Sequence, residues 1–547
     1  MQSELKTALY NALRITQPEL QKDYLYRRCV DKYVNALLPA IRSAIATQPH
    51  RSNLLDDQFS FSHSAIREVI GTIGKSQRYI YQLMRDDETT SLLVDVMKGF
   101  SKNGIAKLSV VRLNPLYENL VLDELLNATA VITPATRTKD NTADSAHNYS
   151  VFVDPASLAS FIAKSRTTLR QTRRYGAYTR KLLRNIIIAE QLQKAIQSAD
   201  DANSQPYINE RWTMADSGRI YGTGLSLQRI PKEVRHAALG YCHKYDFRAC
   251  AFALMGSLAK QIDPTLKIGA LEDYIGNRAK IRQRIADQLN ISVELVKTIF
   301  TAMGFGAELK NTPFAAIRGE LAKAARQRQG TSERLSAEDY CQLGEHEYQQ
   351  LLANDSFIDI YNALQRVNQT ILDYTADNDL QIGDHKYSPI DPKPKKRRKN
   401  KRPTNKERTK KRRTNEKRTN KQKLAWIYQA LESVVMLAFV DFSKQEPLLT
   451  THDCIYYKQR LPQATADDIH YQLREAFPLL SFEHEAITPI AEDDFYQQRY
   501  AEADAFAREH REHIAREEIA AQEYFRALRN AVVSAENSAA NNEALAA

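Results

Sequence analysis

The sequence contains few cysteines, and none of them stand in a paired motif. Five occur among 547 residues, with no CxxC pair, at Cys29, Cys242, Cys250, Cys341 and Cys454. This spacing excludes a disulfide framework and a cysteine-based zinc cluster, so we expect reduced thiols. A chain of this length has ample capacity to form two or more hydrophobic cores.

Long apolar runs are also missing. No run reaches the roughly 18 residues that a membrane span requires, and the N-terminal residues lack the apolar segment of a signal peptide. Glycine and proline, 18 of each, are too few for a collagen-like or wholly disordered chain. We therefore expect a cytoplasmic protein of ordinary globular composition that does not bind membranes.

The positive charge is concentrated in one segment. The formal net charge is +11, but residues 392–423 alone carry 18 Lys and Arg against two Glu, a net +16. The rest of the chain therefore carries −5. Because the segment has almost no apolar side chain to bury, we predict a disordered insertion that adds salt-dependent affinity for nucleic acid.

Hydrophobic periodicity divides the chain into regions. Apolar residues three and four apart predict helices up to about residue 130, and a polar stretch at 131–150 predicts a loop. Residues 64–85 fit a helix-turn-helix and two packed helices about equally well. A long helical region to about 198 includes a basic run at 166–184 that suits a phosphate backbone, although a solvated helix face has the same composition. Turn signals and short extended segments at 203–262 predict the start of a sheet.

Two aspartates stand within apolar stretches. Asp246 precedes the apolar run ACAFALMGSLA, and Asp453 lies between His452 and Cys454 before IYY. A carboxylate at the end of a buried strand is costly unless it is paired or binds a metal. Two such carboxylates brought together would repel each other, and two Mg²⁺ ions would relieve this repulsion and serve phosphoryl transfer. Taken alone, each aspartate is more often an N-cap or a strand-end turn residue than a metal ligand.

A helix between the two aspartates carries a stripe with a cation and an aromatic ring. Lys297, Thr301 and Phe305 are four residues apart, and Gly304 and Gly306 loosen the end of their helix. Such a stripe suits a triphosphate and a stacked base, although an amphipathic helix with a surface lysine has the same pattern. Upstream, SGRIYGTGLSLQRIP offers glycine for close backbone approach and arginine for phosphate or sugar contacts.

In this order, the elements resemble the polymerase family that includes bacterial DNA polymerase I and the phage-type single-subunit RNA polymerases. SGRIYGTGLSLQRIP is similar to the T-G-R…L-Q-x-I-P stretch of that family, YDFRACAFALMGSLA to motif A, and THDC to motif C. Lys297, seven intervening residues and Phe305-Gly306 resemble motif B. Gln429 matches the glutamine on the helix before motif C. The resemblance covers about residues 205–490.

The resemblance implies a right-hand polymerase fold of the α+β class and assigns roles to individual residues. Asp246 and Asp453 would hold two Mg²⁺ ions, for which Mn²⁺ can substitute, and Lys297 would complete the catalytic set. The expected nucleotide contacts are Phe305, Gly306, Ala251, Arg219 and Thr301. The expected nucleic-acid contacts are His452, Gln429, Arg229 and, from the basic run, Arg173 and Arg174.

Three departures from the family pattern bear on specificity. Where the DNA polymerases place a glutamate that blocks the ribose 2′-OH, five residues after the motif A aspartate, this chain has Ala251. The motif B tyrosine is Phe305, which keeps the ring and loses the hydroxyl. The arginine expected one turn before Lys297 is Val293. We therefore expect weak discrimination between ribose and deoxyribose.

The sequence thus predicts a DNA-directed nucleotidyltransferase that acts in replication, priming or transcription of a mobile element. The alternatives are a strict family A DNA polymerase without proofreading, and a non-catalytic DNA-binding protein that retains the fold. The expected partners are a DNA template and primer with NTPs or dNTPs, and we expect a monomer. The predicted regions are a helical N-terminal domain (1–150), a thumb-like helical region (151–205), palm with motif A (206–262), fingers (263–391), the basic insertion (392–423), palm with motif C (424–500) and a charged C-terminal helix and tail (501–547).

Overall fold

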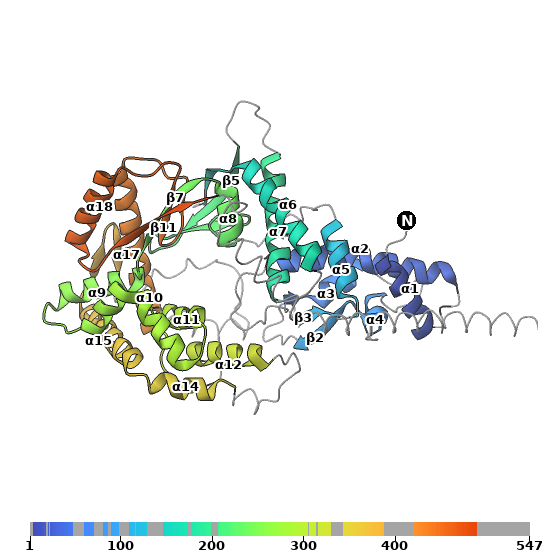
Figure 1. Cartoon of the computed structure of the whole chain (residues 1–547), viewed down its shortest axis with the longest axis horizontal. Helices are drawn as coiled ribbons and strands as arrows, with labels where there is room; N and C mark the ends of the chain where they lie inside the picture. The colour runs from blue at the N-terminus through green and yellow to red at the C-terminus, as the bar shows by residue number, and fades with distance from the viewer. Residues whose placement is uncertain are drawn as a thin grey trace, which may run out of the picture.

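The computed structural model has mixed helix and strand architecture (Figure 1). The predicted C-terminal helix at 501–547, most of the basic insertion, and the side chains of Phe305, Arg173 and Arg174 lie outside the residues that it describes. The described residues are 4–17, 20, 22–47, 59–70, 80–85, 89–97, 109–114, 116–127, 146–172, 177–197, 206–304, 306–312, 315–329, 343–387 and 419–488.

The N-terminal region contains a sheet as well as helices, which corrects the expectation of a purely helical domain. Its three antiparallel strands lie in the order β1-β3-β2. Strands of three to five residues are too short for periodicity to separate them from helix. The segment 71–79 between α3 and α4 lies outside the described residues, so the helix-turn-helix interpretation stays open. The elements are α1 (Glu4–Thr16), α2 (Asp23–Thr47), β1 (Phe59–Phe61), α3 (His63–Ile70), α4 (Ile80–Arg85), β2 (Leu93–Met97), β3 (Ser109–Leu113) and α5 (Glu118–Asn127).

A second three-stranded sheet, β4-β5-β6, begins inside the predicted loop at 131–150. The long helices α6 and α7 pack against each other and separate the N-terminal elements from the rest of the molecule (Figure 1). Their buried residues, such as Phe161 and Ile187, belong to the same core as α1 and α2. The elements are β4 (Ala146–Phe152), α6 (Pro155–Thr172), α7 (Ala177–Gln197), β5 (Tyr207–Met214), β6 (Ile220–Thr223) and α8 (Lys232–Leu239).

A four-stranded antiparallel sheet in the order β10-β11-β7-β12 lies between two hydrophobic cores. Successive strand side chains point to opposite faces. Cys242 and Tyr456 therefore contribute to the core of the N-terminal and central elements, while Tyr245 and Ile455 pack in the other core. The strands are β7 (Cys242–Phe247), β10 (Leu449–Thr450), β11 (Cys454–Tyr457) and β12 (Phe482–Ile487).

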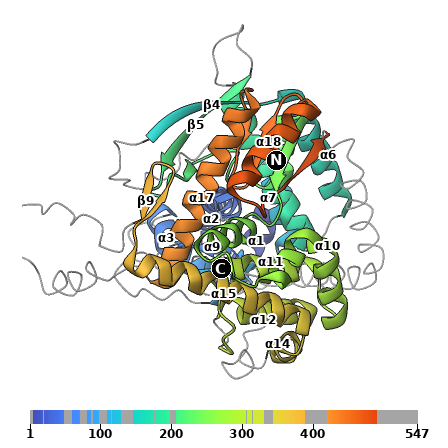
Figure 2. The ribbon, with the colours of Figure 1, turned by 90° about the vertical axis from the view of Figure 1, so that its left-hand side faces the viewer.

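Helices cover one face of this sheet and continue away from it. In Figure 2, α17 runs past α9 towards α15, and α14 and α12 follow next to α15. The β8–β9 hairpin also contacts α17. The elements are α9 (Cys250–Ile262), α10 (Gly269–Leu289), α11 (Val293–Gly304), α12 (Ala316–Gln329), α14 (Glu345–Leu352), α15 (Asp355–Asp377), β8 (Leu380–Ile382), β9 (His385–Tyr387), α17 (Asn420–Ser443) and α18 (Gln463–Ala476).

The start of α17 lies inside the predicted basic insertion. Thr419 and Gln422 form a reciprocal capping box, so the last residues of the 392–423 segment are helical. Lys421 in this first turn lies 3.1 Å from Glu308. Among the described residues, α17 alone is long and apolar enough to meet the requirements of a membrane span, and 61% of its apolar window is buried within the protein.

Phe439 on α17 fixes the sheet from the covered face. Its fully buried ring contacts Tyr245, Phe247 and Phe482, with centroids 5.0 to 5.7 Å apart. We predict that Phe439→Ala lowers the free energy of unfolding by about 3–4 kcal/mol because it leaves a cavity in this core. Leu437→Ala, on the same helix but 58% exposed, should change it by less than about 0.5 kcal/mol. Urea unfolding followed by circular dichroism compares the free energies of unfolding of the two variants with that of the wild type. Equal losses of stability in both variants would contradict the role of Phe439 in fixing the sheet.

Candidate active site

The backbone pairing of β7 with β11 brings Asp246 and Asp453 together. Asp246 is paired in register with Cys454, the residue that follows Asp453. One residue further, the backbone N–H of Phe247 donates to the carbonyl of Asp453 at 2.9 Å. One oxygen of each carboxylate and the Sγ of Cys454 all lie within 4.8 Å of one another. The two aspartates that are 207 residues apart in the chain therefore form one site.

A sharp turn after β7 places the start of α9 beside this pair. Ala249 adopts a left-handed conformation with φ of +44°, which is unusual for a residue with a Cβ atom. Helix α9 begins at the next residue, and Ala251 follows in its first turn. Ala251 is half-buried and lies beside the end of α11. A Cβ atom added to Gly304 of α11 would lie 3.4 Å from the Cβ atom of Ala251.

The two carboxylates differ in their electrostatic surroundings. Desolvation by the surrounding protein, together with the charge of Asp246, raises the pKa of Asp453, although Asp453 retains exposed surface. Asp246 is half-buried and contacts a cation directly, since the Nζ of Lys244 lies 3.1 Å from its Oδ2. Burial lowers the pKa of Lys244, but the negative charges around it outweigh that effect and raise the pKa overall. The ammonium therefore stays charged.

A second group of charges lies on the neighbouring strand β12. Glu483 is paired in register with Asp246, yet its carboxylate accepts from Arg248 and from Arg278 of α10, the latter at 2.9 Å. Glu485 is paired in register with Lys244 and lies 3.4 Å from its ammonium. Glu483 and Glu485 thus bind basic side chains of their own. The carboxylates that lie close to each other are those of Asp246 and Asp453.

Arg219 joins the loop before β6 to the turn that carries Asp453. Its Nε donates to Nδ1 of His452 at 2.9 Å and lies 3.1 Å from Oε2 of Glu432 on α17. The guanidinium also lies over the ring of Tyr221, 5.6 Å from its centroid. Burial, and then the charge of Arg219, lowers the pKa of His452 to about 4, so the imidazole is neutral at neutral pH and accepts this bond.

Glu432 is a buried carboxylate, 2% exposed, within an apolar helix. Its Oε1 accepts from the hydroxyl of Tyr428 at 2.6 Å. Burial raises its pKa to about 7 despite the opposing charge of Arg219. The contact between Glu432 and the guanidinium positions Arg219 from the buried side of α17.

Gln429 lies next to the same loop. Its Oε1 accepts from the hydroxyl of Ser217 at 3.2 Å. Gly218 has a φ of +78°, and a Cβ atom there would clash with the ring of His385 on the β8–β9 hairpin, at 2.1 Å. A glycine is therefore required where the hairpin meets the loop. Through Ser217, Gln429 is connected to the loop that carries Arg219, which forms a polar cluster with His452 and Glu432 beside Asp453.

The other residues predicted to contact the nucleotide or the nucleic acid lie on α11, just after α11 and in the turn after β6. Lys297 is exposed on α11, with its Nζ 4.0 Å from Glu294, and the Thr301 hydroxyl donates to the Lys297 carbonyl within the helix. Gly306 ends the helix with a φ of +79°. Arg229 is exposed in the turn that follows β6.

The oxygen atoms of Asp246 and Asp453 suit Mg²⁺ or Mn²⁺, which prefer carboxylate ligands. Cys454 does not suit these ions. Burial raises the pKa of its thiol to about 11, and Sγ lies 2.8 Å from the hydroxyl of Thr451, so it is a neutral, hydrogen-bonded thiol. The fit to a hard cation therefore rests on the two carboxylates.

The sequence interpretation missed Lys244, Glu432 and Tyr428. The spacing of two residues between Lys244 and Asp246 on one strand already places both side chains on the same face. Glu432 lies three residues after Gln429, so both share a helix face, and an acidic residue in so apolar a helix is a signal by itself. The partner of each group becomes evident only in the folded structure.

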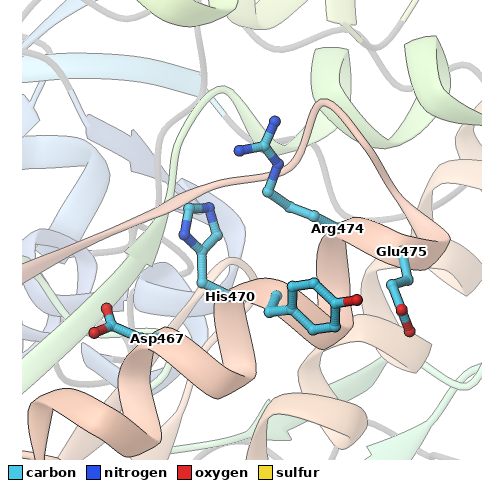
Figure 3. Close-up of a pocket in the computed structure, with 5 residues that line it drawn as sticks. Asp467, His470, Arg474 and Glu475 are labelled. Carbon is cyan, nitrogen blue, oxygen red and sulfur yellow. The ribbon is translucent and has the colours of Figure 1, made fainter.

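A surface hollow on α18 lies on the other face of the sheet. Its volume is about 400 Å³. Figure 3 shows His470 and Arg474 projecting to the same side of the helix. Ile469 of α18 packs in the core that contains Tyr245 and Ile455, whereas Asp246 and Cys454 face the opposite way. The hollow is therefore separate from the carboxylate pair.

No protein family and no curated protein matches this chain. The POL domain of Pol1 from M. smegmatis, solved in complex with DNA primer-template and dNTP, has a TM-score of 0.35 and 11% sequence identity to it. The similarity covers 83% of this chain and 81% of that one. A TM-score of this size establishes neither a shared fold nor a shared activity.

The buried Glu432 predicts a pH dependence of stability. Its folded-state pKa of about 7 lies above the ordinary value of 4.5, so the folded protein retains a proton that the unfolded chain loses between these values. Stability from this group is therefore present at acidic pH and falls as the pH rises through 7. Relative to Glu432→Gln, the wild type should lose roughly 2–3 kcal/mol between pH 5 and pH 8. Thermal unfolding of both proteins at pH 5 and pH 8 measures this loss. Stabilities of the wild type and Glu432→Gln that change in parallel with pH would contradict a raised pKa of Glu432.

Proposed function

We propose that this protein is a template-directed nucleotidyltransferase that uses the Asp246–Asp453 pair. The observation that carries the proposal is the juxtaposition of these two carboxylates on paired strands, with Lys244 and the Arg219 cluster around them. Asp246 and Asp453 at adjacent strand ends would hold a pair of divalent cations, which are the ions that serve phosphoryl transfer.

In the proposed reaction, a primer 3′-OH attacks the α-phosphate of a nucleoside triphosphate. A new oxygen–phosphorus bond forms, the bond between the α-phosphorus and the bridging oxygen breaks, pyrophosphate leaves with that oxygen, and the 3′-OH proton passes to water. Bound Mg²⁺ supplies Lewis-acid stabilisation of the developing charge. Asp246 and Asp453 would hold the ions, Lys297 would neutralise the triphosphate, and Phe305 would stack on the incoming base.

The polar cluster beside Asp453 would contact the nucleic acid. Arg219 is fixed by Glu432 and His452, while Gln429 is oriented by Ser217, so neither side chain needs much reorganisation to bind. Preorganised donors of this kind suit the sugar and base edges of a duplex minor groove. The proposed partners are a DNA template and primer.

The choice between DNA and RNA synthesis depends on Ala251. Ala251 offers only a methyl group where the family has a glutamate, and a Cβ atom added to Gly304 of α11 would lie 3.4 Å from that methyl group. We propose weak ribose discrimination, which favours an enzyme that accepts both NTPs and dNTPs over a strict DNA polymerase.

We predict that Asp246→Asn and Asp453→Asn each reduce primer extension about 10³-fold or more, because each replaces a charged metal ligand with a neutral side chain of the same shape. Single-turnover extension of a primed DNA template, with dNTPs and NTPs in separate reactions, measures the effect. Asp467→Asn, on α18 at the opposite face, is the matched control and should retain activity. Absence of product from either nucleotide pool with the wild type would favour the non-catalytic alternative.

Ala251→Glu should raise the preference for dNTPs over NTPs about tenfold or more, because a carboxylate at this position would approach the ribose 2′-OH. Single-nucleotide incorporation with a matched dNTP and NTP gives the ratio of kcat/KM values. Ala251→Ser is the control and should leave the ratio within about twofold. A wild-type enzyme that already rejects NTPs strongly would overturn the proposed weak discrimination and favour the strict DNA polymerase.

A further inference from the structure

Lys244 places a buried positive charge directly beside the proposed metal ligands. Its side chain is 11% exposed and lies on the same face of β7 as Asp246, two residues along the strand. The ammonium is 3.1 Å from Oδ2 of Asp246, so it occupies one side of a carboxylate that a divalent cation would also need.

A second carboxylate lies within reach of the same ammonium. Glu485 is paired in register with Lys244, and its Oε2 lies 3.4 Å from Nζ. Lys244 is therefore shared between Asp246 and a glutamate at the edge of the sheet. Glu483, the other acidic residue on this face of β12, is already bound to Arg248 and Arg278.

We infer that Lys244 is an internal counter-cation that competes with divalent metal for Asp246, and that Glu485 is the alternative partner to which its ammonium transfers when metal binds. This inference rests on the proposed metal role of Asp246 and Asp453. Lys244 acts through Asp246, so it is a positioning residue. The device keeps two neighbouring carboxylates from repelling each other before the cations and the nucleotide arrive.

The two partners of the ammonium predict effects of opposite sign. Lys244→Met removes the competing charge and should tighten the binding of Mn²⁺ about tenfold or more at low ionic strength. Glu485→Gln removes the alternative partner, so Lys244 stays on Asp246, and Mn²⁺ binding should weaken several-fold. In the Lys244→Met background, Glu485→Gln should have a clearly smaller effect, because there is no longer an ammonium to relocate.

The experiment measures Mn²⁺ dissociation constants by electron paramagnetic resonance of the free ion, on the full-length protein without nucleic acid. Lys244→Arg, which keeps the charge, should bind within about threefold of the wild type. Lys232→Met is the matched control: its ammonium lies 3.8 Å from Glu485 and is 55% exposed, and the change should be less than about twofold. Lys244→Gln provides a second charge-removing variant, and thermal unfolding verifies that each is folded.

Two results separate this inference from the proposed function. If Asp246→Asn and Asp453→Asn abolish the Mn²⁺ site but Lys244→Met and Lys244→Gln leave its dissociation constant within twofold, the inference is overturned and the proposed metal site stands. If the two aspartate variants bind Mn²⁺ as the wild type does, the proposed site is wrong, and the inference falls with it.

Discussion

The pairing of β7 with β11 is the constraint on which the rest of the site depends. The hydrogen bond from the Phe247 amide to the Asp453 carbonyl sets the stagger of the two strand ends, and the stagger brings two like-charged groups together. Backbone hydrogen bonds in a sheet cannot slip by one residue without moving every side chain to the opposite face. The repulsion between the carboxylates is thus imposed by the fold, and the surrounding cations offset it.

The neighbouring cations have distinct roles because their partners differ, although both side chains are almost fully buried. Lys244 is held against Asp246 within the sheet, whereas Arg219 is positioned by Glu432 from the interior of α17. Burial raises the pKa of Glu432, because the charged carboxylate is costly to remove from water. This buried carboxylate positions Arg219 beside Asp453. Strongly shifted pKa values of this kind are typical of functional sites.

Strong local patterns predicted much of this arrangement. The apolar stretches beside Asp246 and Asp453 indicated buried strand ends, and the resemblance placed Gln429 on a helix before motif C, which is α17. Short strands such as β1 to β3 escaped prediction, because three to five residues carry too little periodicity. The register that pairs Lys244 with Glu485 depends on strands 241 residues apart, and nothing local to either strand specifies it. The start of α17 inside the basic segment depended on the Thr419 cap, whose polar residues resemble those of the insertion.

Localised cleavage of the chain by bound Fe²⁺ determines whether Asp246 and Asp453 form one divalent-cation site. Fe²⁺ with ascorbate and peroxide generates hydroxyl radicals that cut the nearest backbone. If the two carboxylates share one cation site, cuts occur both at the end of β7 and in the turn between β10 and β11, and these cuts are suppressed by excess Mg²⁺ and lost in Asp246→Asn. Cleavage confined to other elements, or cuts at the two strands that persist in Asp246→Asn, would contradict a shared cation site.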